Sequence, residues 1–188
     1  ITPLSNKDCF YIVERYKTEF TYPLHSHLEF ELNYVENAEG VQRIVGDSSE
    51  VIGNYDLVLI TGKDLEHTWE QHDCKSKQIR EITIQFSSDL FFSNFVDKNQ
   101  FASIRKMLKI AQNGIAFPMS AILKVYSLLD TLASQQQSFY TVLNFLSILY
   151  ELSMCPNPKI LSSSSFAKAE INSESRRVMK VQNYINQH

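Results

Sequence analysis

The stretch YPLHSHLEFELNYVENAEG, residues 22–40, decides the fold, because polar and apolar side chains alternate along most of it. Successive side chains of a β-strand point to opposite faces, so this alternation predicts a strand with one apolar and one polar face. The apolar face would carry Leu28, Phe30, Leu32 and Tyr34. The polar face would carry His25, His27, Glu29 and Glu31. That polar face is either solvent-exposed surface or the lining of a site.

The composition is that of an ordinary soluble globular chain of 188 residues, with 44% hydrophobic and 21% charged residues. The net charge of −3 disfavours a free-standing nucleic-acid-binding protein, which usually has a basic balance. Three cysteines without a C-x-x-C pair indicate free thiols in a reducing compartment. The most apolar stretch, residues 139–154, is too short to span a bilayer, and no signal peptide is evident. We therefore expect a cytoplasmic protein without a membrane partner.

The sequence pattern changes near residue 87. Before it, short apolar or alternating runs are separated by Gly, Asn and Asp residues that favour tight turns. The predicted strands cover residues 9–16, 30–36, 41–45, 49–52, 56–61, 67–71 and 78–86. Short strands at roughly ten-residue spacing are typical of a β-sandwich or a β-barrel.

Beyond residue 87, apolar residues recur at helical spacing in three segments. The first helix lies within 99–114 and ends at Gly114, the second follows Pro118, and the third lies within 139–154. The second helix has an apolar stripe of Ile122, Val125, Leu129 and Leu132. The third has a stripe of Val142, Leu146 and Leu149, widened by Phe139, Leu143 and Leu152.

Two motifs resemble those of the cupin superfamily. One is His25-x-His27-x-x-x-Glu31 with Gly40 behind it, and the other is GNYDLVLITGKDLEHTW (53–69), which contains His67 but lacks the usual proline. The order of HSHLEFELNYVENAEGVQRIVGDS, YDLVLITGKDLEHTW and ITIQF, followed by helices, resembles the N-terminal sensor domain of AraC-type transcription regulators. The resemblance covers essentially the whole chain.

The resemblance implies a mainly β plus α fold with four parts. Residues 1–87 would form a cupin-like β-barrel of the double-stranded β-helix type, and residues 88–155 a helical dimerisation hairpin. Residues 156–172 would be a linker, and residues 173–188 the first helix leading into a helix-turn-helix DNA-binding domain that this chain lacks.

The function that this resemblance implies is regulatory rather than enzymatic. A bacterial regulator of this type would bind a small-molecule effector, with a sugar as one candidate, and would form a homodimer. It would contact DNA only through the missing C-terminal domain. The alternative is a metal-dependent cupin enzyme, either an oxygenase or an isomerase.

Six residues are candidates for lining an effector pocket: His25, His27, Glu31, Arg43, His67 and Trp69. A few polar groups that converge within an apolar barrel are typical of small-molecule sites. Arg43 would face Glu31 or Asn33 across the strand ladder and bind a carboxylate or hydroxyl of the effector. Trp69 would share a face with His67 and stack on a planar or sugar-like ligand. A surface ion pair for Arg43 and ordinary core packing for Trp69 remain open.

Four of these residues, His25, His27, Glu31 and His67, also form a candidate metal site. Three imidazoles and one carboxylate suit Zn, Fe, Mn or Ni. Three interpretations remain open: a divalent metal, a pocket lining without metal, and a hydrogen-bonded structural network. No cofactor other than this metal is expected.

The third helix is the candidate dimer contact. Phe145, Ile148 and Leu152 lie off its main stripe, so we expect apolar surface on both sides of the helix. The candidate dimerisation residues are Val142, Phe145, Leu146, Leu149 and Leu152.

Overall fold

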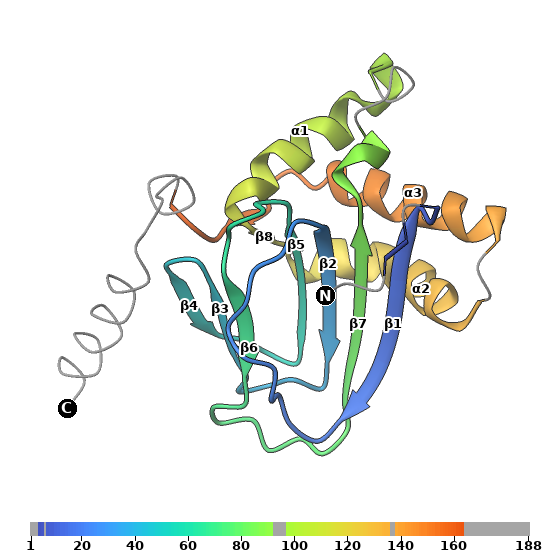
Figure 1. The fold of residues 1–188 in the computed structure, drawn as a ribbon. Helices are drawn as coiled ribbons and strands as arrows, with labels where there is room; N and C mark the ends of the chain where they lie inside the picture. Colours follow the sequence, from blue (N-terminus) through green and yellow to red (C-terminus); the bar gives the residue numbers. More distant parts are fainter. Residues whose placement is uncertain (1–3, 6, 92–96, 136–137, 164–188) are drawn as a thin grey trace.

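A computed structural model describes residues 4, 5, 7–91, 97–135 and 138–163 of the chain (Figure 1). The helix expected over residues 173–188 and the later part of the expected linker lie outside these residues. Within the described ranges, none of the helices has the length and apolar character needed to cross a membrane.

Seven strands lie where the sequence pattern predicts them, within one residue at each end. They are β1 (Phe10–Lys17), β2 (Phe30–Glu36), β3 (Gln42–Val45), β4 (Ser48–Val51), β5 (Tyr55–Ile60), β6 (His67–Glu70) and β7 (Ile79–Phe86). Two further strands of two residues each, β8 (Ile115–Ala116) and β9 (Lys159–Ile160), were not predicted. They are too short to produce a periodic pattern.

The strands form two antiparallel sheets. One has six strands in the order β1-β7-β2-β5-β8-β9, and the other has three strands in the order β4-β3-β6. In the described part of the chain these sheets are hydrogen-bonded separately, so the closed barrel that we expected is not formed there. The architecture there is mostly antiparallel sheet with helices.

The alternation that starts at His25 predicts that residues 25–29 extend this strand, but β2 begins only at Phe30. Before it, His25 forms an isolated bridge with His67 of the three-stranded sheet, whereas β2 pairs with β5 and β7 of the larger sheet. The chain therefore crosses from one sheet to the other between these points, which interrupts the strand. As a result Leu28, predicted on the apolar face, is 72% exposed.

The three predicted helices are confirmed as α1 (Ala102–Ile110), α2 (Met119–Ser134) and α3 (Phe139–Ser153). Short 3-10 turns occupy η1 (Ser88–Phe91), η2 (Asn99–Phe101) and η3 (Ala111–Asn113). Gly114 follows η3 with φ of 65°, a conformation that favours glycine. At the start of α3, Ser138 and Thr141 form a capping box, which satisfies backbone N–H groups at the helix N-terminus.

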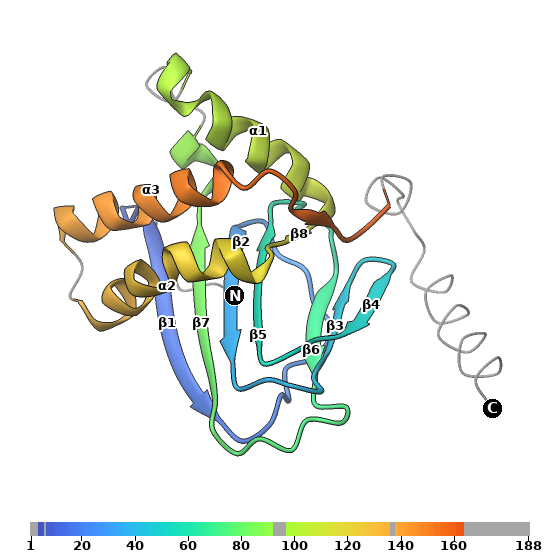
Figure 2. The ribbon, with the colours of Figure 1, turned by 180° about the vertical axis from the view of Figure 1, so that it is seen from behind.

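The six-stranded sheet is the middle of three layers, with the helices against one face and the three-stranded sheet against the other (Figure 2). Leu32 and Tyr34 of β2 belong to the core shared with the helices, whereas Val35 belongs to the core shared with Trp69 of the smaller sheet. Strand alternation therefore directs Glu31, two positions from Asn33 and four from Val35, into the space between the sheets.

The apolar stripe of α2 is confirmed, since Ile122, Val125, Leu129 and Leu132 are all buried. The apolar stripe predicted for α3 does not coincide with the face of the helix that the structure buries. Its buried residues are Thr141, Phe145, Ile148, Leu149 and Leu152, and Val142 and Leu146 are half-buried.

Phe145 is a core residue, with its ring centroid 4.9 Å from that of Phe10 and 5.0 Å from that of Phe86. The expectation that Phe145, Ile148 and Leu152 leave apolar surface exposed is therefore wrong. The outward face of α3, taken together with its C-cap residue Met154, carries other large side chains: Tyr140, Leu143, Tyr150 and Met154.

This packing predicts a large difference between two aromatic truncations on α3. Phe145→Ala should lower the free energy of unfolding by about 3–5 kcal/mol, because it leaves a cavity in the core. The matched control Tyr140→Ala, at a side chain 73% exposed, should change it by less than about 0.5 kcal/mol. Urea unfolding followed by the fluorescence of Trp69 measures both. Equal effects would contradict the observed orientation of α3.

Candidate functional site

Four side chains from two parts of the chain, residues 25–31 and the start of β6, meet between the two sheets. His25 and His27 precede β2, Glu31 lies within it, and His67 begins β6. One ligand atom from each side chain lies within 4.8 Å of the corresponding atoms of the other three. Glu31 and His67 are buried and the other two are half-buried, so the histidine cluster, defined by these four residues, lies at the edge of the interior.

The backbone brings His25 and His67 together. The N–H of His67 donates to the carbonyl of His25 at 2.8 Å, and the N–H of His25 donates to the carbonyl of His67 at 3.2 Å. This is the hydrogen-bonded pair of an antiparallel ladder, which places the two residues directly opposite each other. Their ring centroids are 4.4 Å apart, and the rings of His27 and His67 are 5.0 Å apart.

Each of the three imidazoles is oriented by a backbone carbonyl. The Nδ1 atoms of His25, His27 and His67 lie 2.9 Å from the carbonyl oxygens of Pro23, Glu29 and Leu65, respectively. A carbonyl oxygen only accepts, so each Nδ1 carries the hydrogen and donates it. Each Nε2 is then left for the cluster. Histidines that bind metals are typically held in this way by their other ring nitrogen.

Glu31 supplies the negative charge of the cluster and is only 3% exposed. Its Oε2 accepts hydrogen bonds from His27 Nε2 at 3.0 Å and from Gln85 Nε2 at 2.9 Å. Its Oε1 lies 3.8 Å from His67 Nε2, beyond hydrogen-bonding distance.

The Nε2 of His67 is buried and has no hydrogen-bond partner among the described residues. A buried nitrogen without a partner costs free energy, so such an atom in a native protein calls for an explanation. A divalent cation would meet both this nitrogen lone pair and the neighbouring carboxylate. The residues therefore fit a metal ion of the kind that binds imidazole and carboxylate ligands.

The pKa values in the cluster are shifted in different directions: that of His27 is raised, whereas those of the buried Glu31 and His67 are lowered. Burial alone would lower the pKa of His27, but the hydrogen bond and charge of Glu31 outweigh burial and raise it. Burial alone would raise the pKa of Glu31, but the hydrogen bond from His27 and nearby imidazole charge lower it. For His67, burial lowers the pKa to about 4. At neutral pH His67 is therefore neutral and Glu31 charged, the forms that bind metal.

Arg43 lies elsewhere than predicted. It is 3% exposed and donates to Asp56 and, at 2.7 Å, to Glu50. The prediction that it faces Glu31 or Asn33 is wrong, because β3 pairs with β4 and β6 and has no ladder with β2. Its guanidinium is engaged by two carboxylates of the protein itself.

Trp69 borders the cluster, with its ring centroid 6.4 Å from that of His67. Its Nε1 donates to Oδ2 of Asp56 at 3.2 Å, and the side chain is 5% exposed. A buried indole whose N–H has a protein partner is typical of core packing. In this structure Trp69 is a packed core residue beside the histidine cluster.

Three residues that hydrogen-bond to the predicted site residues were not identified from the sequence: Gln85, Asp56 and Glu50. Gln85 lies opposite Glu31 in the pairing of β2 with β7, and Asp56 begins the apolar run DLVLI. A polar residue within or beside an apolar strand is the signal that could have identified the first two. Glu50 has no comparable signal.

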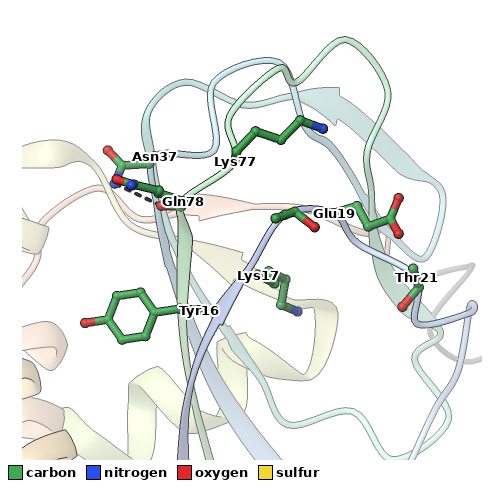
Figure 3. A pocket seen from close by; sticks show the side chains of 8 residues that line it. Tyr16, Lys17, Glu19, Thr21, Asn37, Lys77 and Gln78 are labelled. Atoms are coloured by element: carbon green, nitrogen blue, oxygen red, sulfur yellow. Dashed lines mark hydrogen bonds between the residues drawn. The ribbon is translucent and has the colours of Figure 1, made fainter.

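A shallow cleft lies at the opposite end of β2 from the cluster (Figure 3). It is lined by Tyr16, Lys17, Thr18, Glu19, Thr21, Asn37, Lys77 and Gln78. Asn37 Nδ2 donates to the carbonyl of Gln78 at 3.2 Å across it. None of the six predicted pocket residues lines this cleft, so it is separate from the predicted site.

In the metal-free protein we predict that His27 and His67 titrate on opposite sides of pH 6.5, their ordinary value. The raised pKa of His27 favours the folded state at low pH, and this contribution is lost as pH rises through that pKa. The lowered pKa of His67 has the opposite effect. As pH falls from about 6.5 to about 4, its contribution to the stability of the folded state is lost, because the unfolded chain binds the proton at a higher pH than the folded chain does.

An NMR titration of the imidazole signals measures both values. Glu31→Gln should lower the pKa of His27, because it removes the charge that raises it. The control Glu29→Gln should have a smaller effect, since that carboxylate lies 3.8 Å from His27 Nδ1 and contributes least. Simultaneous titration of both rings near pH 6.5 would contradict the cluster geometry.

Comparison with known proteins supports the fold. No protein-family model matches the chain, and no curated protein matches its sequence. Among solved structures, ToxT from Vibrio cholerae bound to an unsaturated fatty acid matches with a TM-score of 0.50 and 14% identity, over 96% of this chain and 65% of that chain. An apo ToxT variant matches with a TM-score of 0.48 and 14% identity, over 79% and 55%.

The chain thus spans between about half and two thirds of the length of these ToxT chains. ToxT is an AraC-family regulator whose N-terminal effector-binding domain has a cupin-like fold. At this level of identity the likeness concerns the fold alone. The chain therefore shares its fold with ToxT, which supports the resemblance drawn from the sequence motifs at the level of the fold.

Proposed function

We propose that this chain is the effector-binding domain of an AraC-type transcription regulator, and that the histidine cluster is the centre of its binding site. The observation that carries the proposal is the buried, unpartnered Nε2 of His67 beside the carboxylate of Glu31. The regulators that share the fold support the class of function, whereas the cluster supports the position of the site.

The cluster would hold one divalent cation through Nε2 of His25, His27 and His67 and a carboxylate oxygen of Glu31. The cation would replace the proton between His27 and Glu31, so its binding would release a proton. Gln85 and the carbonyls of Pro23, Glu29 and Leu65 would keep the ligands oriented. Such an ion supplies a Lewis acid that accepts oxygen ligands.

The effector would be a small molecule that presents an oxygen donor to the cation, such as the hydroxyls of a sugar or a carboxylate. The solved ToxT complex contains an unsaturated fatty acid, whose head group is a carboxylate. In this chain the ring of Tyr22 is 64% exposed and its centroid lies 4.5 Å from that of His25. An exposed aromatic ring beside the cluster would favour a ligand with a flat or sugar-like face.

The regulator would act in the cytoplasm as a homodimer and contact DNA through a further, C-terminal domain. The greater length of the ToxT chains supports a further domain. The outward face of α3 supports dimerisation, because Tyr140, Leu143, Tyr150 and Met154 recur at helical spacing and are 42–73% exposed. This face replaces the predicted contact residues, since Phe145, Leu149 and Leu152 are buried in the chain's own core. The other two, Val142 and Leu146, are half-buried and packed against that core.

The ligand set alone is also compatible with the second candidate, a metal-dependent oxygenase or isomerase. We favour the regulator because the neighbours that share the fold are regulators. Turnover of a small molecule by the metal-loaded chain would favour the enzyme, whereas binding without turnover would favour the regulator.

We predict that protein purified without chelator or affinity-tag metal contains about one equivalent of a divalent transition metal, because the cluster offers one set of ligands. His27→Ala and His67→Ala should each remove most of it. His72→Asn is the matched control, since His72 lies outside the cluster at φ of 44°, which asparagine tolerates. Elemental mass spectrometry measures the metal. Metal-free protein that zinc fails to stabilise would contradict the proposal.

We predict a dimer that dissociates when a charge is placed on the outward face of α3. Leu143→Glu and Tyr150→Glu should yield monomers, because burying an unpaired carboxylate in an apolar contact is costly. The control Val51→Glu, at a residue 56% exposed on β4, should remain dimeric. Light scattering after size-exclusion chromatography distinguishes the species. A dimer that persists in both α3 variants would exclude this face.

A further inference from the structure

The chain that leaves the helices docks against the two sheets. After α3, β9 pairs with β8, and the segment continues with Leu161 donating its N–H to Gly114 at 2.9 Å. Ser162 donates its N–H to Asn113 at 2.8 Å. Leu161 is 8% and Ser162 only 2% exposed, so the first part of the expected linker is packed into the domain. We call residues 159–163 the exit segment.

Asp47, in the turn between β3 and β4, holds the end of the exit segment. Its Oδ1 accepts from Ser162 Oγ at 3.0 Å and from the N–H of Ser163 at 2.9 Å. Burial would raise the pKa of Asp47, but these hydrogen bonds outweigh burial and lower it, as expected for a carboxylate that receives backbone and hydroxyl donors.

The neighbouring Gly46 shows how closely the turn fits the exit segment. It has φ of 58°, and a Cβ at this position would lie 2.3 Å from Ser162 Oγ. A side chain there would collide with the docked serine. The β3–β4 turn and the exit segment therefore fit together without spare room.

A second contact joins the exit segment to the same strand pair. Lys159 Nζ donates to Oε1 of Glu50 on β4, and Oε2 of Glu50 accepts from Arg43 on β3 at 2.7 Å. Both ends of the exit segment are thus held by β4 and by the turn between β3 and β4.

That strand pair also positions the histidine cluster. On β3, Val45 pairs with His67 and Arg43 pairs with Trp69, and the N–H of Gly46 donates to the carbonyl of Glu66 at 2.8 Å. His67 is the cluster residue whose Nε2 lacks a partner. A ligand that fixes His67 therefore also fixes the strand that pairs with β3.

We infer that the exit segment is a latch whose docking is coupled to binding at the histidine cluster through the three-stranded sheet. The inference rests on the proposed function, which places a cation at that cluster. By linkage, whatever the cation adds to the docking of the exit segment, the docked segment adds equally to the affinity for the cation. The position at which the chain leaves the domain thus becomes sensitive to the ligand.

The test uses the 188-residue chain with zinc as the ligand. Asp47→Ala removes both hydrogen bonds to the exit segment, and Ser162→Ala removes only the hydroxyl donor. Asp97→Ala, at an exposed carboxylate before α1, is the matched control. Calorimetry measures the zinc affinity, and hydrogen exchange measures protection of the amides of residues 161–163.

We expect Asp47→Ala to speed exchange in the exit segment and to weaken zinc binding at least about fivefold, the lower end of typical allosteric coupling. Zinc should slow exchange at the same amides in the wild-type chain, and Asp97→Ala should behave as wild type. If Asp47→Ala does not fold, Ser162→Ala decides, with the same signs and smaller changes.

Zinc binding of wild-type strength in a variant whose exit segment exchanges faster would overturn the coupling and leave the cation site standing. An absence of zinc binding in the wild-type chain would instead overturn the cation site. The two failures are therefore distinguishable in one experiment.

Discussion

The buried carboxylate of Glu31 is the constraint on which the site depends. A charge that is 3% exposed requires partners, because transferring it out of water is costly. His27 and Gln85 satisfy one of its oxygens, and the other faces His67 without reaching it. Strand alternation in β2 accounts for its position, since the same strand turns Leu32 and Tyr34 toward the helices. The position of Glu31 in the cluster therefore follows from the alternation of β2, which directs one set of side chains toward the helices and the other toward the smaller sheet.

The two sheets are held in register by a second buried network. Arg43 and Trp69 of the small sheet both donate to Asp56 of the large sheet. Removing one member would leave a buried charge without its partner, which costs more than the pair contributes. This network joins the two sheets between which His67 and Glu31 face each other. Arg43 of this network also donates to Glu50, which accepts a hydrogen bond from Lys159 of the exit segment. The three-stranded sheet that supports the site therefore also holds the chain where it leaves the domain.

Most elements were predictable because they depend on local spacing, whereas His67 was grouped with His25, His27 and Glu31 through the resemblance to cupin motifs. The alternation in residues 30–36 and the helical stripe of α2 each have one apolar face, which determines their orientation. The stripe of α3 was predicted wrongly because apolar residues surround that helix, so its sequence does not determine which face Phe145 occupies. The partners of Arg43 were missed because alternation along a strand shows which side chains share a face, but not which other strands that face meets. The break before Phe30 depends on strand pairing far along the chain, which local spacing does not encode.

The most direct test of the account is a crystal structure of the zinc-treated chain, with diffraction data collected on both sides of the zinc absorption edge. The account predicts one anomalous peak about 2.0–2.2 Å from Nε2 of His25, His27 and His67 and from a carboxylate oxygen of Glu31. A cluster that remains joined only by hydrogen bonds, with no anomalous peak, would contradict it.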